Sequence, residues 1–268
     1  PLDLFVVVEA GDHHVTILDG DRFEPLARFP SRFALHGGPK FSPDGRFVTF
    51  MSRDGWVTRY DLWSLQPVAE VRAGINSRNI ALSGDGRTVW VGGPDDGLLR
   101  SVDGGQHFAA PVTVHADRQI ITHRFESMGF DAEGVLHTVW IDKRDLEAAP
   151  KVGGKSSYRG AAIYRNISRD GGATFSPDTK VADHSCECCR IALGVGSDGA
   201  MRALWRHVFE PNVRDHAFAV LRGEAPVDVV RATYDEWRVD GCPHHGPALA
   251  QAADGFHTVW FGIRQEGD

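Results

Sequence analysis

All four cysteines of the sequence lie in two short segments, the second of which also carries two histidines. The first carries Cys186, Cys188 and Cys189, and the second carries Cys242, His244 and His245. Thiolate sulfur and imidazole nitrogen are the donors that a thiophilic transition metal such as Zn or Cu prefers. The six residues are therefore candidate metal ligands, although their spacing matches no standard zinc motif.

The same cysteines allow a structural interpretation. In an exported protein, Cys242 could pair with one of the three upstream cysteines, and a vicinal Cys188–Cys189 bridge is a further option. The sequence leaves the metal and the disulfide alternatives open.

A repeated unit sets the fold that must position these side chains. A short apolar segment, an acidic-Gly tip and a second apolar strand recur five times along the chain. The tips are Asp44-Gly45, Asp85-Gly86, Glu133-Gly134, Asp198-Gly199 and Asp254-Gly255. Such pairs between β-rich runs indicate hairpins, and a repeat of about 40–50 residues is typical of propeller blades. We predict an all-β protein, a β-propeller of about six four-stranded antiparallel blades forming a single domain over residues 1–268.

The two ends of the chain offer strands that could close the ring. Three strands are expected near the N-terminus, at Phe5–Glu9, His14–Asp19 and Glu24–Phe29, while the last blade stops after its second strand. Propellers avoid open edges by completing one blade from both termini. We expect such a closure here.

Propeller geometry also brings separate loops together, because the loop entering each innermost strand opens on one mouth of the central channel. Five side chains in these loops are candidates for binding a cofactor. They are His36, Arg78, His123, Arg124 and Arg190. The candidate metal ligands lie in the fourth and fifth of these loops. We expect both groups to gather at one end of the axis, where a small-molecule or cofactor ligand would bind.

Residues from about 33 to 88 carry a recognisable series of motifs. In order they are His36-Gly-Gly-Pro, Arg53-Asp-Gly, Asp61-Leu-Trp63 and Ser77-Arg78-Asn79. This series resembles the d1-haem propeller domain of dihaem nitrite reductases and its haem d1 biosynthesis relatives, and we assign residues 1–95 to blades of that kind. The resemblance implies that His36 is the proximal iron ligand and that Arg78 contacts the haem carboxylates. No C-x-x-C-H motif for c-type haem is present.

A second motif, S-x-D-G-G-x-x-F, occurs at Ser101–Phe108 and at Ser168–Phe175. It resembles the Asp box, or BNR repeat, of sialidase-type propellers, and we assign residues 96–268 to sialidase-like Asp-box blades. In those families the box is a structural staple. Arg78, Arg124 and Arg190 could form the arginine triad of a sialidase. However, the F/Y-R-I-P motif is missing, and of the four tyrosines only Tyr158 and Tyr234 lie in suitable loops.

Composition excludes some classes of function. The formal charge is −7 and Lys and Arg do not cluster, which argues against a nucleic-acid partner. No apolar run approaches the roughly 18 residues of a membrane span. The chain starts without a basic leader, so any targeting segment is not part of it. We expect a periplasmic or exported protein whose signal peptide lies outside this chain.

Two functions remain. The first is a periplasmic propeller that binds a haem d1-type cofactor or a metal ion (Zn or Cu) at its channel mouth, for redox or cofactor handling. The alternative is a sialidase-like or non-catalytic binding or scaffold propeller with structural cysteines.

Overall fold

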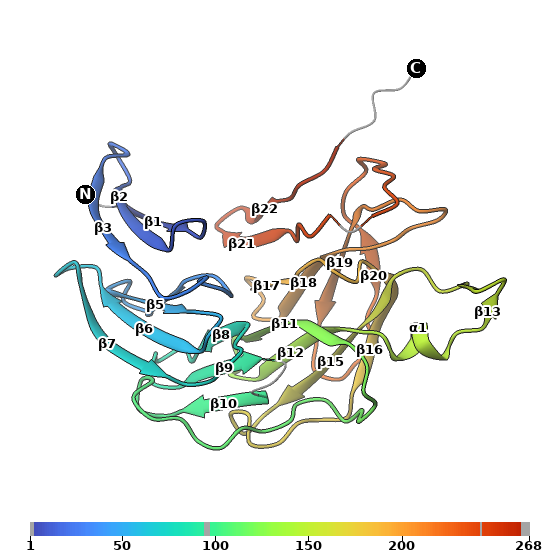
Figure 1. Ribbon diagram of the computed structural model, residues 1–268, viewed down its shortest axis with the longest axis horizontal. Coiled ribbons are helices and arrows are strands. Elements are labelled where there is room, and N and C mark those ends of the chain that lie inside the picture. Colours follow the sequence, from blue (N-terminus) through green and yellow to red (C-terminus); the bar gives the residue numbers. More distant parts are fainter. Residues whose placement is uncertain (1–2, 94–96, 242, 264–268) are drawn as a thin grey trace. The chain divides into compact units, whose positions relative to one another are not determined.

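The computed structural model describes residues 3–93, 97–241 and 243–263. Within them the chain is almost entirely β-structure, with a single short helix, α1 (Arg144–Ala148) (Figure 1). It divides into two compact units, residues 1–112 and residues 113–268. The two units are described separately below. No described helix has the length and apolar character needed to cross a bilayer.

The first unit, residues 1–112, contains three antiparallel sheets. The first sheet consists of β1 (Leu4–Glu9), β2 (His14–Asp19) and β3 (Pro25–Pro30). The second consists of β4 (Lys40–Phe41), β5 (Phe47–Met51), β6 (Trp56–Asp61) and β7 (Gln66–Arg72). The third consists of β8 (Asn79–Leu82), β9 (Val89–Gly93) and β10 (Gly97–Ser101). Strands follow one another in chain order within each sheet, as in propeller blades.

The second unit, residues 113–268, repeats this pattern with one insertion. Its first sheet consists of β11 (His123–Phe130), β12 (Leu136–Asp142), β15 (Ala161–Ser168) and β16 (Thr179–Ser185). Its second consists of β17 (Ala192–Val195), β18 (Met201–Arg206), β19 (His216–Leu221) and β20 (Val229–Arg231). Its third consists of β21 (Ala248–Ala252) and β22 (Gly255–Val259). Helix α1 and the small hairpin of β13 (Lys151–Val152) and β14 (Lys155–Ser156) lie between β12 and β15 in the chain.

The acidic-Gly tips form the turns between the first and second strands of their sheets, as predicted. Gly45 joins β4 to β5 with φ of +67°, and Gly86 joins β8 to β9 with φ of +68°. An L-residue with a Cβ adopts this region only at a cost, so glycine is required where the hairpin reverses. The preceding acid stabilises the turn: Asp85 Oδ1 accepts a hydrogen bond from the Arg87 N–H at 3.0 Å.

Hydrophobic cores form where neighbouring sheets pack. In the first unit, Val15 and Ile17 of β2 pack in one cluster with Val48 and Phe50 of β5 and with Tyr60. In the second unit, the largest cluster joins buried residues of β12, β15, β18 and β19. Every residue of β15 is buried, because both faces of its sheet are covered.

The first strands of successive sheets lie next to each other. In the first unit β4 is beside β8, and in the second unit β11 is beside β17 and β17 beside β21. This is how the innermost strands of propeller blades are arranged. The loops that enter these strands are therefore brought together within each unit, and they carry the candidate site residues.

The two S-x-D-G-G-x-x-F motifs form equivalent turns. Asp103 Oδ1 accepts hydrogen bonds from the Ser101 hydroxyl at 2.7 Å and from the N–H groups of Gln106 and His107 at 2.9 and 3.0 Å. Asp170 Oδ1 makes the corresponding bonds with the Ser168 hydroxyl at 2.7 Å and with two N–H groups, at residues 173 and 174, at 3.0 and 2.9 Å. The two copies of the motif thus share one turn geometry, and the assignment of the motif as an Asp box stays a prediction.

The predicted blade number agrees with the described sheets, whereas closure of the ring stays a prediction. The units hold six blade-like sheets, of which three have four strands, two have three and one has two among the described residues. The three expected N-terminal strands are present as β1, β2 and β3 and form a sheet of their own.

Candidate functional site

The loop before β4 and the loop before β8 meet through His36 and Arg78. His36 is anchored to its own sheet, because its N–H donates to the Met51 carbonyl at 2.7 Å. Arg78 is anchored likewise to β9, by a 2.7 Å bond from its N–H to the Gly92 carbonyl. The His36 ring then joins the two, with Nδ1 donating to the Arg78 carbonyl at 2.7 Å. The structure therefore brings these two predicted residues together.

Gly37 makes this close approach of the two loops possible. Its φ is +80°, and a Cβ at this position would lie 3.0 Å from the Asn79 Cα and 3.1 Å from the Arg78 carbonyl oxygen. Any larger residue would push the loops apart. The glycine that follows His36 in the sequence thus has a defined packing role.

The bond to the Arg78 carbonyl fixes the tautomer of His36. A ring that donates from Nδ1 to a carbonyl carries its lone pair on Nε2, which is the nitrogen that can ligate a metal. Half-burial of the ring restricts it further. Chemically, His36 is suited to act as an axial ligand of iron, the role that the d1-haem resemblance implies.

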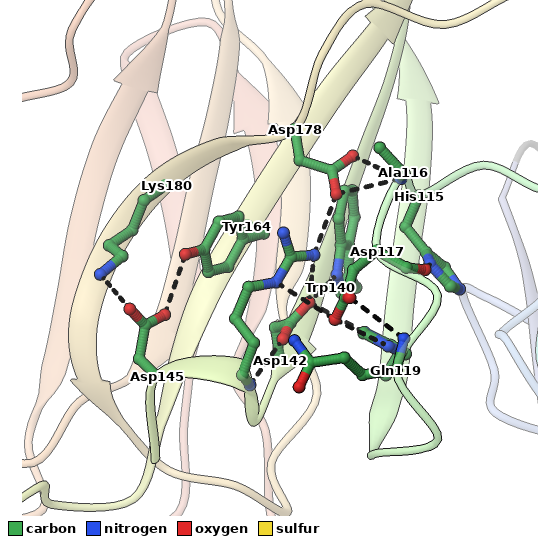
Figure 2. Close-up of polar contacts among 12 residues, drawn as sticks. His115, Ala116, Asp117, Gln119, Trp140, Asp142, Asp145, Tyr164, Asp178 and Lys180 are labelled. Atoms are coloured by element: carbon green, nitrogen blue, oxygen red, sulfur yellow. Dashed lines mark hydrogen bonds and ion pairs between the residues drawn. The ribbon is translucent and has the colours of Figure 1, made fainter. Parts of the chain in front are cut away.

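In the second unit, His123 lies in a polar network with aspartates that sequence reasoning did not single out. His123 Nδ1 donates to Asp142 Oδ2 at 2.9 Å, and Nε2 lies 3.5 Å from Asp117 Oδ2. The His115 ring stacks on His123 with centroids 4.1 Å apart. Trp140 Nε1 also donates to Asp142, at 2.9 Å. Figure 2 shows Asp117, Asp142 and Trp140 directed into this network.

Arg144 supplies the positive charge of the network. Its Nη2 lies 2.7 Å from Asp142 Oδ2 and 2.9 Å from Asp178 Oδ2, while its Nε lies 3.8 Å from Asp117 Oδ2. Burial alone would raise the pKa of Asp142, but the hydrogen bonds from His123, Arg144 and Trp140 outweigh it and hold that pKa well below its ordinary value. Burial followed by the neighbouring His123 lowers the pKa of His115.

This network can be explained without a metal ion. Ligand atoms of Asp117, His123 and Asp142 do lie within 4.8 Å of one another. However, the Arg144 guanidinium already contacts both carboxylates and supplies a positive charge beside them, as a cation would. His123 is thus held between two carboxylates, and its predicted role as a cofactor ligand stays a prediction. The signal that could have revealed the network is Asp142-x-Arg144, which directly follows a buried strand.

The three upstream cysteines converge between β16 and β17. All three are buried, each with 1% of its surface exposed. The Sγ atoms of Cys186 and Cys189 are 3.1 Å apart, and those of Cys186 and Cys188 are 3.6 Å apart. Cys186 and Cys189 are free thiols, whereas Cys188 is disulfide-bonded. The vicinal Cys188–Cys189 bridge is therefore excluded, and Cys242 lies outside the described residues.

Two arginines lie near these thiols. Arg214 Nη1 is 3.7 Å from Cys186 Sγ, and Arg206 is close enough to act electrostatically on Cys189. The hydrogen bond from the Cys189 thiol, followed by the hydrogen bond from the Cys188 N–H and the positive charge of Arg214, lowers the pKa of the Cys186 thiol despite its burial. The hydrogen bond to Cys186 and burial raise the pKa of Cys189.

The remaining predicted residues lie around this cluster. Arg124 donates from Nε and Nη2 to the Glu187 carbonyl, at 3.2 and 3.0 Å. The Arg190 side chain is exposed. The backbone of Arg190 packs against Gly246, where an added Cβ would lie 2.5 Å from the Arg190 carbonyl oxygen. His245 accepts from Arg206 Nε at 3.4 Å through its carbonyl, not through its ring.

The predicted six-residue metal site is assembled only in part. Three sulfurs converge, but Cys188 is disulfide-bonded and so offers no thiolate. His244 and His245 are exposed, and neither belongs to the group of ligand atoms found within 4.8 Å of one another at the cysteines. Among the described residues, only Cys186 and Cys189 are free to ligate a thiophilic metal there.

Comparison with known proteins gives relatives for the first unit. Residues 1–112 match the family model of the Cytochrome D1 heme domain. The chain is 67% identical over 119 residues to the dihydro-heme d1 dehydrogenase of Pseudomonas aeruginosa, and this match covers 44% of this chain and 24% of that protein. The chain thus spans about a quarter of the length of this curated relative.

Solved structures resemble most of the chain. The structure of dihydro-heme d1 dehydrogenase NirN in complex with DHE matches with a TM-score of 0.54 and 31% identity, covering 95% of this chain and 57% of that one. Hydrazine synthase of Kuenenia stuttgartiensis matches with a TM-score of 0.67 and 16% identity, covering 95% and 70%. Together with the repeated antiparallel sheets, these likenesses confirm the predicted β-propeller fold.

Proposed function

We propose that this chain is part of a haem d1-handling propeller, in which residues 1–112 contribute to the cofactor site. The match of these residues to the Cytochrome D1 heme domain supports the proposal. So does the likeness to dihydro-heme d1 dehydrogenase NirN, whose structure was solved in complex with DHE. The ligand is then a haem d1-type molecule, and the function is redox chemistry on it or its handling between proteins.

The single observation that carries the proposal is the anchoring of His36. Its Nδ1 donates to the Arg78 carbonyl, so in the neutral form of the ring Nε2 is the nitrogen that would ligate iron. Iron in a haem takes such a donor as an axial ligand and supplies one-electron chemistry when bound. We propose His36 as the iron ligand and Arg78, whose guanidinium can pair bidentately with carboxylates, as a contact for the haem propionates or other acid groups.

For the second unit we propose a non-catalytic role as Asp-box blades, resembling those of sialidase-like proteins. The two equivalent Asp-box turns favour it. Sialidase activity itself is not favoured, because the arginine-bearing F/Y-R-I-P motif is missing from the sequence.

We propose a periplasmic or exported location. Cys188 is disulfide-bonded, and stable disulfides form in oxidising compartments rather than in the cytosol. Mapping disulfides in protein from the native host would test this, since fully reduced cysteines would speak against export.

The test of the cofactor proposal is a titration of the purified protein with haem d1, followed by visible absorbance. We expect saturable binding in the wild type and a roughly tenfold or greater loss of affinity in His36→Ala, as expected when an axial ligand worth about 1.4 kcal/mol or more is removed. His107→Ala is the matched control, because His107 lies in the same unit and its side chain is 87% exposed. Equal affinity in all three proteins would contradict the proposal.

A further inference from the structure

The three buried cysteines of the second unit combine a disulfide with two free thiols in one contact cluster. Cys186-Glu187-Cys188-Cys189 places Cys186 and Cys189 in a C-x-x-C spacing. The two free sulfurs lie 3.1 Å apart, and the Cys186 sulfur also lies 3.6 Å from the disulfide-bonded Cys188. A thiol and a disulfide sulfur at van der Waals distance are the reactants of thiol–disulfide exchange.

The surroundings favour an internal reaction over one with outside reagents. Each cysteine is 99% buried, since its exposed fraction is 1%. Arg214 Nη1 lies 3.7 Å from Cys186 Sγ and adds positive charge beside the sulfur that would attack. The Cys186 backbone is held in place by a 2.9 Å bond from its N–H to the Arg206 carbonyl. A fixed, buried sulfur next to a guanidinium is an environment that favours a reactive thiolate.

We propose that Cys186, Cys188 and Cys189 form a thiol–disulfide exchange site, through which the disulfide of Cys188 is transferred to the Cys186–Cys189 pair. In the first step, the Cys186 thiolate attacks the Cys188 sulfur. A Cys186–Cys188 bond forms, the bond of Cys188 to its original partner breaks, and the electron pair leaves on the partner sulfur, which takes up a proton.

In the second step, Cys189 attacks the Cys186 sulfur. A Cys186–Cys189 disulfide forms, and Cys188 leaves as the thiolate, while the proton of Cys189 is released. One disulfide and two thiols are present before and after the two steps. The exchange therefore needs no external oxidant or reductant.

The sulfur geometry distinguishes this proposal from a metal site. In tetrahedral zinc sites with Zn–S distances of about 2.3 Å, two sulfurs lie about 3.8 Å apart. Cys186 and Cys189 are closer than this, at 3.1 Å. In addition, a disulfide sulfur is not a thiolate, so Cys188 cannot complete a three-sulfur ligand set. The cluster fits sulfur–sulfur chemistry better than metal binding.

Peptide mapping of the oxidised protein reads the exchange directly. Trypsin releases residues 181–190, with Cys186, Cys188 and Cys189, and residues 239–264, with Cys242, as separate peptides. A bond to Cys242 links the two peptides, whereas bonds among the three upstream cysteines stay within one. Cleavage after Glu187 then separates Cys186 from Cys188 and Cys189, so a bond to Cys186 is distinguished from a vicinal one. Fragmentation of residues 188–190 in the mass spectrometer shows which of Cys188 and Cys189 carries the alkyl group, and therefore which of the two is bonded to Cys186. Acid quenching and alkylation stop exchange before digestion.

Two isosteric variants test the order of steps. In Cys189→Ser the second step is blocked, and we expect the internal Cys186–Cys188 bond to accumulate in residues 181–190. In Cys186→Ser the attacking sulfur is gone, and we expect Cys188 to keep its original partner in every molecule. The wild type, which needs no substitution, should show the internal Cys186–Cys189 bond together with the original linkage. The proposal is overturned if all three proteins show the same single linkage of Cys188, or if zinc analysis finds one bound metal per chain that is lost in both variants.

Discussion

Asp142 is a fully buried carboxylate whose Oδ2 receives hydrogen bonds from His123, Arg144 and Trp140. Asp142→Asn keeps the shape but removes the charge that compensates Arg144. Breaking a buried ion pair on one side costs more than forming it gains, so we expect the free energy of unfolding to fall by about 3 kcal/mol. Urea unfolding measures this, with Asp254→Asn as the control because that side chain is 82% exposed. An unchanged midpoint for Asp142→Asn would mean that the network contributes no stability.

The buried His216 and the half-buried His207 make stability depend on pH. Burial is the main cause that lowers the pKa of His207 and of His216 from 6.5 to about 4. Between these values the unfolded chain binds protons that the folded chain does not, so stability falls as the pH drops from 6.5 to 4. We expect a lower urea midpoint at about pH 5 than at about pH 7. The glutamine in His216→Gln cannot be protonated, so this variant should show a smaller difference between the two urea midpoints. If the wild type and the variant show the same difference, His216 does not cause the pH dependence.

At the residue scale, sequence reasoning found the side chains but not all of their contacts. His36 and Arg78 were predicted together because they precede consecutive innermost strands, and the structure joins them by a hydrogen bond. His123 was predicted to face a ligand. In the structure it is the register partner of Asp142 on the neighbouring strand, and its ring is hydrogen-bonded to that carboxylate. A hydrogen bond to a carboxylate at the end of a neighbouring strand can be predicted only when the register of the two strands is known.

At the scale of elements, the Asp-box turns should be local staples of their sheets. Asp170 accepts hydrogen bonds from the Ser168 hydroxyl, from two backbone N–H groups and from the Thr174 hydroxyl. Asp170→Ala leaves these donors without their acceptor, so we expect the melting temperature to fall by a few degrees. The melting temperature of Asp170→Asn should fall less, because asparagine keeps one acceptor oxygen. Calorimetry checks this order, and a melting temperature unaffected by Asp170→Ala would remove the staple role.

The strands were predictable because turn chemistry and apolar alternation agree at each tip. Gly45 and Gly86 mark hairpins that occur where they were expected. The insertion between β12 and β15, with α1 and the β13–β14 hairpin, could not be predicted, since residues 143–156 carry neither a repeat nor a clear period. The repeat predicts the strands of each blade, but not the position or the structure of an insertion between them.

At the scale of the whole molecule, the sequence predicted one propeller composed of two kinds of blade. The described chain consists of two compact units that meet in sequence at residues 112 and 113, and the Cytochrome D1 heme domain model covers the first of them. The predicted change of blade type after residue 95 falls within the first unit, in which Phe108 packs against the third sheet. This change of blade type stays a prediction.

The central claim is that His36 is the axial ligand of a haem d1-type cofactor. It is tested most directly with His36→Gly, which removes the imidazole and leaves space for a free one. With haem d1 bound, we expect the visible spectrum of the variant to differ from that of the wild type and to return to it when imidazole is added, because the free imidazole would ligate the iron in place of the His36 ring. A variant spectrum identical to the wild type without imidazole would contradict the claim.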